Sequence, residues 1–224
     1  MEYFLDTASI EDIKEYNPLG LVDGITTNPA LLAKEGNEPV EQIKKIASLV
    51  SGPISVEVTH PDPAGMVKQA MKLNKLADNI VIKVPASVQG LLAAQDMKAA
   101  GLKMNVTLIF HPSQAIPFIK LGVDYVSLFI GRVEDFGLSN IEAISQMKQA
   151  IVKMESPTKL LSASIRDPNY LIDAIIAGSD AITVPPSCWE KVYNNPLFQL
   201  GEKEFLDSWK QLSVSVRELY ESID

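Results

Sequence analysis

The stretch NIVIKVPAS, residues 79–87, contains a short apolar run with a lysine inside it. Its isoleucines and valines are typical of a strand that is buried on both faces, as in a parallel sheet covered by helices. Lys83 lies within that strand. A charged ammonium in an apolar interior costs several kcal/mol unless it is paired or loses its proton. Lys83 is therefore an internal ion-pair partner or a functional amine, and the rest of the chain must distinguish these.

Apolar runs rich in valine and isoleucine recur along the chain. We expect strands at residues 3–5, 21–25, 54–58, 80–84, 103–109, 125–129, 159–162 and 181–184. Segments of helical periodicity separate these runs, with N-cap residues, first-turn prolines and C-terminal glycines at their ends. We expect helices at residues 10–16, 39–50, 63–77, 88–100, 112–122, 140–155 and 168–178.

Eight such strand–helix units predict a parallel (β/α)₈ barrel, the TIM barrel of the α/β class. A doubly wound open sheet is the alternative, but it needs no eight even units and usually has a Gly-rich first turn that is absent here. A further helix at about 197–220 follows the eighth unit. We expect it to cover one end of the barrel or to pack on a neighbouring subunit. Residues 1–224 are thus interpreted as one barrel domain with an added C-terminal helix.

The composition limits the classes of partner. Lys and Arg number 20 against 28 Asp and Glu, for a net charge of −8, which argues against nucleic acids and anionic membranes. No apolar run approaches the roughly 18 residues of a membrane span, and the start MEYFLDTAS does not resemble a signal peptide. Cys188 is the single cysteine, so no internal disulfide forms. We expect a cytoplasmic protein with no membrane or nucleic-acid partner.

The two histidines, His60 and His111, lie far apart in the sequence, and each precedes a proline. A metal-dependent enzyme needs a cluster of histidine and acidic ligands. We therefore expect no metal site and no cofactor.

Polar residues occur at or near the carboxyl end of every expected strand, where barrel enzymes carry their sites. They are Asp6, Thr26, Thr27, Asn28, Glu57, Thr59, Lys83, Asn105, Thr107, Ser127, Arg132, Ser162, Ser164, Arg166 and Thr183. Inward-facing residues alternate along each strand, so these groups converge on one mouth of the barrel. A lone threonine or serine more often pairs with polar neighbours inside a barrel. Three ionisable groups in one core, Asp6, Glu57 and Lys83, instead indicate a functional site.

These residues fit carbonyl chemistry through an imine. A lysine in a mostly apolar pocket favours its neutral form and can attack a ketone. The iminium then accepts the electrons of a neighbouring C–C bond, while Asp6 or Glu57 takes the proton of the hydroxyl on the cleaved carbon. Asn and Thr side chains hold substrate hydroxyls, and Arg132 and Arg166 bind a phosphate. The residues alone predict a Schiff-base barrel enzyme, without specifying the sugar.

Six motifs that span nearly the whole chain resemble those of the transaldolases. They are FLDTAS (4–9), GITTNP (24–29), IKVPAS (82–87), NVTLIF (105–110), FIGR (129–132) and SASIRD (162–167). The resemblance is strongest to the short subfamily that includes the fructose-6-phosphate aldolases. It implies a homo-oligomer, a pentamer or decamer, in which the C-terminal helix reaches a neighbour.

The resemblance implies a role for each site residue. Lys83 matches the Schiff-base lysine, and Asp6 matches the acid/base of C–C bond cleavage. Glu57 and Thr107 match the pair that holds a catalytic water. The residues implied to bind substrate are Thr26, Asn28, Asn105 and Ser127 at the dihydroxyacetone unit, and Arg132, Ser164 and Arg166 at the phosphate.

Glu57 and Phe129 make the resemblance closer to the transaldolases of this subfamily. Transaldolases carry Glu and Phe at these positions, whereas fructose-6-phosphate aldolases carry Gln and Tyr. A phenol can donate a proton and help dihydroxyacetone leave, whereas Phe129 cannot. The implied reaction moves a dihydroxyacetone unit from a ketose phosphate (sedoheptulose 7-phosphate or fructose 6-phosphate) to an aldose phosphate (glyceraldehyde 3-phosphate or erythrose 4-phosphate), as in the pentose phosphate pathway.

Two other functions stay open at this stage. One is a fructose-6-phosphate-type aldolase that releases free dihydroxyacetone, which dependence on an acceptor would distinguish. The other is a non-enzymatic barrel that binds a phosphosugar or acts as a scaffold. A purely structural Lys83, paired with Glu57 across neighbouring strands, is the alternative to the Schiff-base role.

Overall fold

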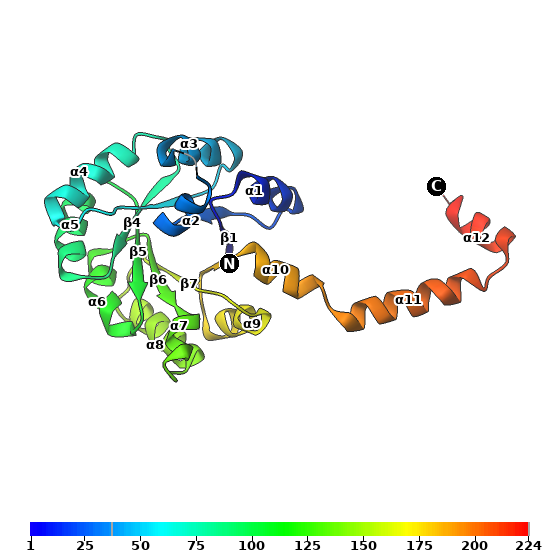
Figure 1. The fold of residues 1–224 in the computed structure, drawn as a ribbon. Coiled ribbons are helices and arrows are strands. Elements are labelled where there is room, and N and C mark those ends of the chain that lie inside the picture. The colour runs from blue at the N-terminus through cyan, green and yellow to red at the C-terminus, as the bar shows by residue number, and fades with distance from the viewer. Residues whose placement is uncertain (37, 224) are drawn as a thin grey trace. The chain divides into compact units, whose positions relative to one another are not determined.

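The computed structural model describes residues 1–36 and 38–223. Within this part of the chain, eight parallel strands close into a barrel in the order β1 to β8, with helices around it (Figure 1). The strands are β1 Glu2–Asp6, β2 Gly24–Thr26, β3 Ile54–Glu57, β4 Ile80–Pro85, β5 Met104–Ile109, β6 Tyr125–Phe129, β7 Lys159–Ala163 and β8 Ala181–Val184. The (β/α)₈ barrel predicted from the sequence is confirmed.

Every helix expected between the strands is present. These helices are α1 Ile10–Tyr16, α3 Pro39–Leu49, α4 Pro63–Leu73, α5 Val88–Ala99, α6 Pro112–Leu121, α8 Asn140–Lys153 and α9 Pro168–Ala177. Their N-caps are the expected polar residues: the side chains of Ser9, Asp62 and Ser87, for example, each accept a first-turn backbone N–H. These caps fix where each helix begins. They thereby also fix the length of the loop between each strand and the helix that follows it.

Four short helical segments were not expected. They are the 3₁₀ helix η1 Asn17–Leu19 and the helices α2 Pro29–Lys34, α7 Ile130–Asp135 and α10 Pro186–Tyr193. Each is too short to show a clear helical period in the sequence. The expected strand at 21–25 is instead the shorter β2, Gly24–Thr26. Asp23, just before it, is bound to Tyr3 twice: its backbone N–H donates to the Tyr3 carbonyl, and its carboxylate accepts the Tyr3 N–H at 2.8 Å.

The barrel interior changes character along the strands. Toward the amino ends it is filled by an apolar cluster that includes Phe4, Val81 and Tyr125, with the Phe4 and Tyr125 rings 5.7 Å apart. Asp6, Lys83 and Ser127 lie two residues further along the same strands. Because side chains alternate between the two faces, these three point to the same interior as the apolar cluster. The apolar cluster therefore closes the floor beneath the polar residues at the carboxyl ends.

The chain divides into two compact units, Met1–Cys188 and Trp189–Asp224, with the boundary inside α10. The first unit holds the entire barrel. The second holds α11 Pro196–Lys210 and α12 Val214–Glu221. That residues 1–224 act as one domain stays a prediction. Over the described residues, no helix is long and apolar enough to cross a membrane, and no group of three or more His, Cys, Asp or Glu side chains is placed to hold a metal ion.

The expectation of one continuous helix at about 197–220 is wrong, because the chain turns between α11 and α12. Ser213 has an extended backbone (φ −61°, ψ 151°) and starts α12. Serine favours such N-terminal positions over helix interiors, so a new helix begins after Ser213 instead of α11 continuing through it. The rings of Trp209 and Tyr220 contact each other edge to face at 5.0 Å, so the two helices pack across the turn.

Candidate active site

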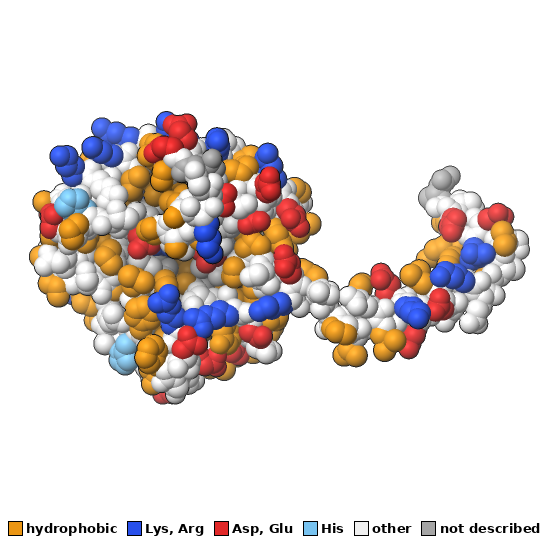
Figure 2. Space-filling model, in the orientation of Figure 1, with side chains coloured by type: hydrophobic (Ala, Val, Ile, Leu, Met, Phe, Trp, Pro, Cys, Tyr) orange, Lys and Arg blue, Asp and Glu red, His pale blue; other side chains and the backbone are white. Residues whose placement is uncertain are grey.

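A cavity of about 530 Å³ opens at the carboxyl ends of the strands. Figure 2 shows this face of the barrel, with basic side chains gathered along one side of the central hollow. The lining residues are Asp6, Thr26, Asn28, Pro29, Ala30, Glu57, Lys83, Thr107, Leu108, Ser127, Phe129, Arg132, Ala163, Ser164, Arg166 and Thr183. The structure thus brings together eleven of the twelve site residues predicted from the sequence, Asn105 being the exception.

Lys83 is a buried amine that is not paired with a carboxylate. Its side chain is 6% exposed, and its Nζ donates a hydrogen bond to the Thr27 carbonyl at 2.6 Å. Among the residues that the structure describes, no ion pair joins Lys83 to Asp6 or Glu57. Burial lowers the pKa of Lys83, and the nearby charges of Asp6 and then Glu57 oppose this by a smaller amount. The neutral amine, the nucleophilic form, is thereby favoured.

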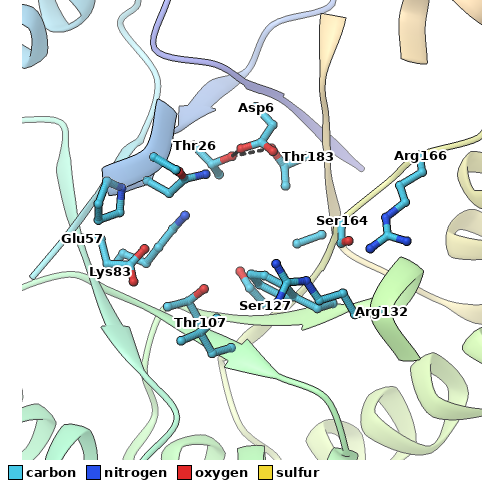
Figure 3. A pocket seen from close by; sticks show the side chains of 16 residues that line it. Asp6, Thr26, Glu57, Lys83, Thr107, Ser127, Arg132, Ser164, Arg166 and Thr183 are labelled. Carbon is cyan, nitrogen blue, oxygen red and sulfur yellow. Dashed lines mark hydrogen bonds between the residues drawn. The ribbon is translucent and has the colours of Figure 1, made fainter. Parts of the chain in front are cut away.

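Asp6 ends β1 and is held by a hydroxyl from the next strand. Thr26 Oγ1 donates to Asp6 Oδ1 at 2.8 Å and lies 2.6 Å from Thr183 Oγ1 (Figure 3). Burial raises the pKa of Asp6, while the charge of Lys83 and the hydrogen bond from Thr26 lower it. A carboxyl group with a raised pKa beside an amine with a lowered pKa is suited to exchange protons with a substrate.

Glu57 ends β3 and is paired in register with Lys83 on β4. Burial raises the pKa of Glu57, and the charge of Lys83 opposes this. Both side chains point into the cavity from the same side (Figure 3). The site therefore holds two carboxyl groups that approach Lys83 from different strands.

A β-bulge in β5 shapes the cavity lining near Thr107. The register against β6 shifts between Val106 and Ile109, and Leu108 has a left-handed backbone with φ 61°. Regular alternation would turn one of two consecutive residues away from the barrel interior. Here Thr107 and Leu108 both line the cavity, which the sequence did not indicate.

Asn105 lies deeper in the barrel than expected. It is fully buried and does not line the cavity. Its Nδ2 donates to Ser55 Oγ at 3.0 Å, and its Oδ1 accepts from Ser127 Oγ at 2.7 Å. Ser127 does line the cavity, so Asn105 orients a lining hydroxyl. Ser55 is a buried partner that its place early in a strand did not reveal.

Asn28 combines two functions at the end of β2. It is the N-cap of α2, and its Oδ1 accepts the Leu31 backbone N–H at 2.9 Å. Asn28 also lines the cavity. The cap bond to its side-chain oxygen therefore restrains a lining side chain.

Two arginines and a serine face Lys83 and Glu57 across the cavity (Figure 3). Arg132 comes from α7, while Ser164 and Arg166 follow β7. Arg166 Nη1 bonds both carboxylate oxygens of Asp135, at 2.8 and 2.7 Å. The cavity therefore has an acid–amine side and a cationic side, as an anionic substrate with a reactive carbonyl requires.

Close backbone packing fixes this cationic side. Ser164 has φ 63°, and a Cβ on Gly131 would come within 2.3 Å of the Ser164 carbonyl oxygen. Glycine at 131 is thus required by the approach of α7 to the segment after β7. The same approach brings the residue that follows Gly131, Arg132, beside the loop that carries Arg166.

Comparison with known proteins gives the same family that the motifs resemble. The model of the transaldolase/fructose-6-phosphate aldolase family matches residues 3–222. The chain belongs to this family. A probable transaldolase of Methanococcus maripaludis is 44% identical over 210 residues, with 94% of this chain and 98% of the relative covered. A probable transaldolase of Lactiplantibacillus plantarum is 40% identical over 215 residues, with 96% and 99% covered.

Members of this family are enzymes, and the prediction of an enzyme is confirmed. Solved structures add only the fold. A putative phosphonomutase from Burkholderia cenocepacia superposes with a TM-score of 0.57 at 14% identity, over 94% of this chain and 93% of that one. A thiamine phosphate pyrophosphorylase from Pyrococcus furiosus gives 0.59 at 14% identity, over 82% and 85%.

Proposed function

We propose that this family member is a transaldolase that transfers a dihydroxyacetone unit through a Schiff base on Lys83, as in the pentose phosphate pathway. The observation that carries the proposal is the state of Lys83. It is a buried amine with a lowered pKa, held by a backbone carbonyl and flanked by two carboxyl groups with raised pKa values. A structural lysine paired with Glu57 would instead form an ion pair within the cavity.

The first step is attack of the neutral Lys83 amine on the ketone carbon of the donor. The addition gives a carbinolamine, which loses water to form the iminium. Protons must leave the nitrogen and reach the departing hydroxyl during this step. Glu57 and Thr107 line the cavity on the side of Lys83 and Ser127, and we assign them to a water that carries these protons.

The second step is cleavage of the C–C bond between the first and second carbons after the imine carbon. Asp6 takes the proton from the hydroxyl of the departing carbon, that carbon becomes an aldehyde, and the bonding electrons move into the iminium to give an enamine. The enamine then attacks the aldehyde of the acceptor, and Asp6 returns the proton to the new alkoxide. Water hydrolyses the resulting iminium, which frees the ketose phosphate and restores the Lys83 amine. We assign Asn28, Thr26 and Ser127, which line the cavity, to the hydroxyls of the three-carbon unit.

The cationic side of the cavity suits the phosphate of donor and acceptor. Arg132 supplies positive charge and N–H donors, Arg166 supplies further N–H donors with its charge partly balanced by Asp135, and Ser164 adds a hydroxyl. These groups lie across the cavity from Lys83 (Figure 3). A sugar phosphate bound between the two sides would direct its ketone toward the amine.

Phe129 favours transfer over release of free dihydroxyacetone. It lines the cavity, and its ring contacts Phe110 edge to face at 5.6 Å. A phenylalanine ring has no proton to give to the enamine carbon. The three-carbon intermediate therefore remains on Lys83 until an aldehyde acceptor arrives.

The proposal is tested by incubating the enzyme with fructose 6-phosphate, with and without erythrose 4-phosphate. A transaldolase forms sedoheptulose 7-phosphate with the acceptor and little free dihydroxyacetone without it. Equal release of dihydroxyacetone in both reactions would indicate the aldolase instead. No turnover in either reaction, with fructose 6-phosphate still bound, would indicate a phosphosugar-binding barrel.

We also propose a cytoplasmic homo-oligomer, a pentamer or decamer, that needs no cofactor. The single cysteine, Cys188, is buried and forms no disulfide, which suits a reducing compartment. The helix α11 carries exposed apolar side chains, among them Phe198 and Phe205. Such side chains favour burial against another subunit. Light scattering of the purified protein measures the oligomeric state.

A further inference from the structure

Thr183 lies in the active site without a role in the chemistry described above. It is the third residue of β8, it is 3% exposed, and it lines the cavity. Its Oγ1 lies 2.6 Å from Thr26 Oγ1. The strand β1, which carries Asp6, pairs with β2 on one side and with β8 on the other. Two hydroxyls therefore meet in front of the strand that ends in Asp6.

The direction of these hydrogen bonds follows from counting protons. A hydroxyl has one proton to donate and two lone pairs that accept. Thr26 gives its proton to Asp6 Oδ1, since an ionised carboxylate only accepts. In the 2.6 Å contact with Thr183, Thr26 must therefore be the acceptor. The donors run in one direction, from Thr183 to Thr26 to Asp6.

We propose that Thr183 is a positioning residue, which orients the hydroxyl of Thr26 toward Asp6 and strengthens its hydrogen bond to the carboxylate. This inference rests on the proposed role of Asp6 as the base of C–C bond cleavage. The chain of hydroxyls occupies Oδ1 and leaves Oδ2 to take the substrate proton. A hydroxyl that itself accepts a hydrogen bond is a better donor, because the bonds in a chain polarise one another.

The charged groups around Asp6 come from other elements. Lys83 on β4 favours the ionised carboxylate, whereas Glu57 on β3, when ionised, opposes it. Arg132 and Arg166 lie across the cavity (Figure 3). Among the described residues, the strands that flank β1 contribute hydroxyls at this level and no charge. Loss of the Thr183 hydroxyl leaves all of these charges in place, so any change in the protonation of Asp6 reports the hydroxyl chain.

The test compares Thr183→Val, which removes the hydroxyl at nearly constant volume, with Thr183→Ser, which retains it. The pH dependence of kcat is measured for transfer from fructose 6-phosphate to erythrose 4-phosphate. We expect the acid limb of Thr183→Val to move to higher pH by roughly half a unit, with a several-fold lower kcat and little change in KM. Thr183→Ser should keep the wild-type profile.

Borohydride trapping of dihydroxyacetone on Lys83 serves as the control for an intact site, since it involves no C–C cleavage. We expect equal trapping in wild type and both variants. If the pH profiles of kcat for Thr183→Val and wild type superimpose while trapping is normal, this inference is overturned and the proposed function stands. The inference is also overturned if Thr183→Ser shows the same shift as Thr183→Val, because the shift would then come from packing and not from the hydroxyl. If wild type traps no adduct, the proposed function fails and this inference fails with it.

Discussion

Glu57 and Lys83 are paired in register across β3 and β4, yet Lys83 gives its hydrogen bond to the carbonyl of Thr27. Burial moves the two pKa values toward each other, lowering that of Lys83 and raising that of Glu57. Both shifts favour the neutral forms. The barrel thus holds an amine and a carboxyl group side by side without an ion pair, ready to exchange protons with a bound carbonyl compound.

Replacing Lys83 by Met should abolish turnover without loss of fold. The native state disfavours the protonated amine, so between its lowered native pKa and the unfolded value of 10.5 the unfolded chain binds more protons. Wild-type stability therefore rises as the pH rises toward 10.5. We expect Lys83→Met to unfold at an equal or higher temperature than wild type at pH 7, by calorimetry, and the difference to shrink near pH 10.

Lys103→Met is the matched control, because Lys103 is exposed. It should retain turnover and show the wild-type dependence of stability on pH. Normal turnover by Lys83→Met would end the Schiff-base account.

Replacing Asp6 by Asn should slow transfer by about 10²–10⁴-fold, the usual contribution of a general acid/base. Trapping of dihydroxyacetone on Lys83 should persist, since it requires no C–C cleavage. The raised native pKa of Asp6 gives the wild type a contribution to stability below the unfolded value of 3.8 that is lost as the pH rises through the native pKa. Asp6→Asn should therefore be at least as stable as wild type at pH 7. A large fall in melting temperature there would contradict this.

Replacing Arg132 by Ala should weaken binding of phosphorylated substrates specifically. A hydrogen bond to a charged group contributes about 1.5–3 kcal/mol, so KM for fructose 6-phosphate should rise roughly 10- to 100-fold. Steady-state kinetics with dihydroxyacetone as the donor give the comparison, because this donor has no phosphate. An equal rise for both donors would remove Arg132 from the phosphate site.

Replacing Phe129 by Tyr should increase release of free dihydroxyacetone from fructose 6-phosphate without an acceptor. The added phenol would face the cavity and could protonate the enamine carbon. Product analysis by chromatography measures the ratio of release to transfer. Phe110→Tyr is the control, because Phe110 packs on Phe129 but does not line the cavity. An unchanged ratio in Phe129→Tyr would mean that this position does not control the fate of the intermediate.

The strands were predictable because parallel strands are buried on both faces and read as runs of valine and isoleucine. The helices between them were predictable from their caps. The turn at 211–213 was not predictable. The residues on both sides of it have a helical pattern, which obscured the preference of Ser213 for an N-cap position. The short helices α2 and α7 were missed for lack of a full period, although Asn28 and Pro29 are an N-cap and a first-turn proline.

The candidate site was predictable to the extent that strand ends converge in a barrel. The depth of Asn105 was not predictable, because it depends on the stagger of neighbouring strands, which the sequence does not reveal. Its role at the dihydroxyacetone unit stays a prediction. The bulge at Leu108 and the hydrogen bond between Thr26 and Thr183 depend on the same tertiary register. Sequence alone identified Thr183 as polar but gave no partner for it.

The central claim is that Lys83 forms the Schiff base, and trapping tests it most directly. The enzyme is incubated with fructose 6-phosphate, without acceptor, and reduced with borohydride, and its peptides are analysed by mass spectrometry. We predict a reduced three-carbon adduct on Lys83, because the donor is cleaved and its dihydroxyacetone unit is retained. An adduct on another lysine, or on none, would contradict the account.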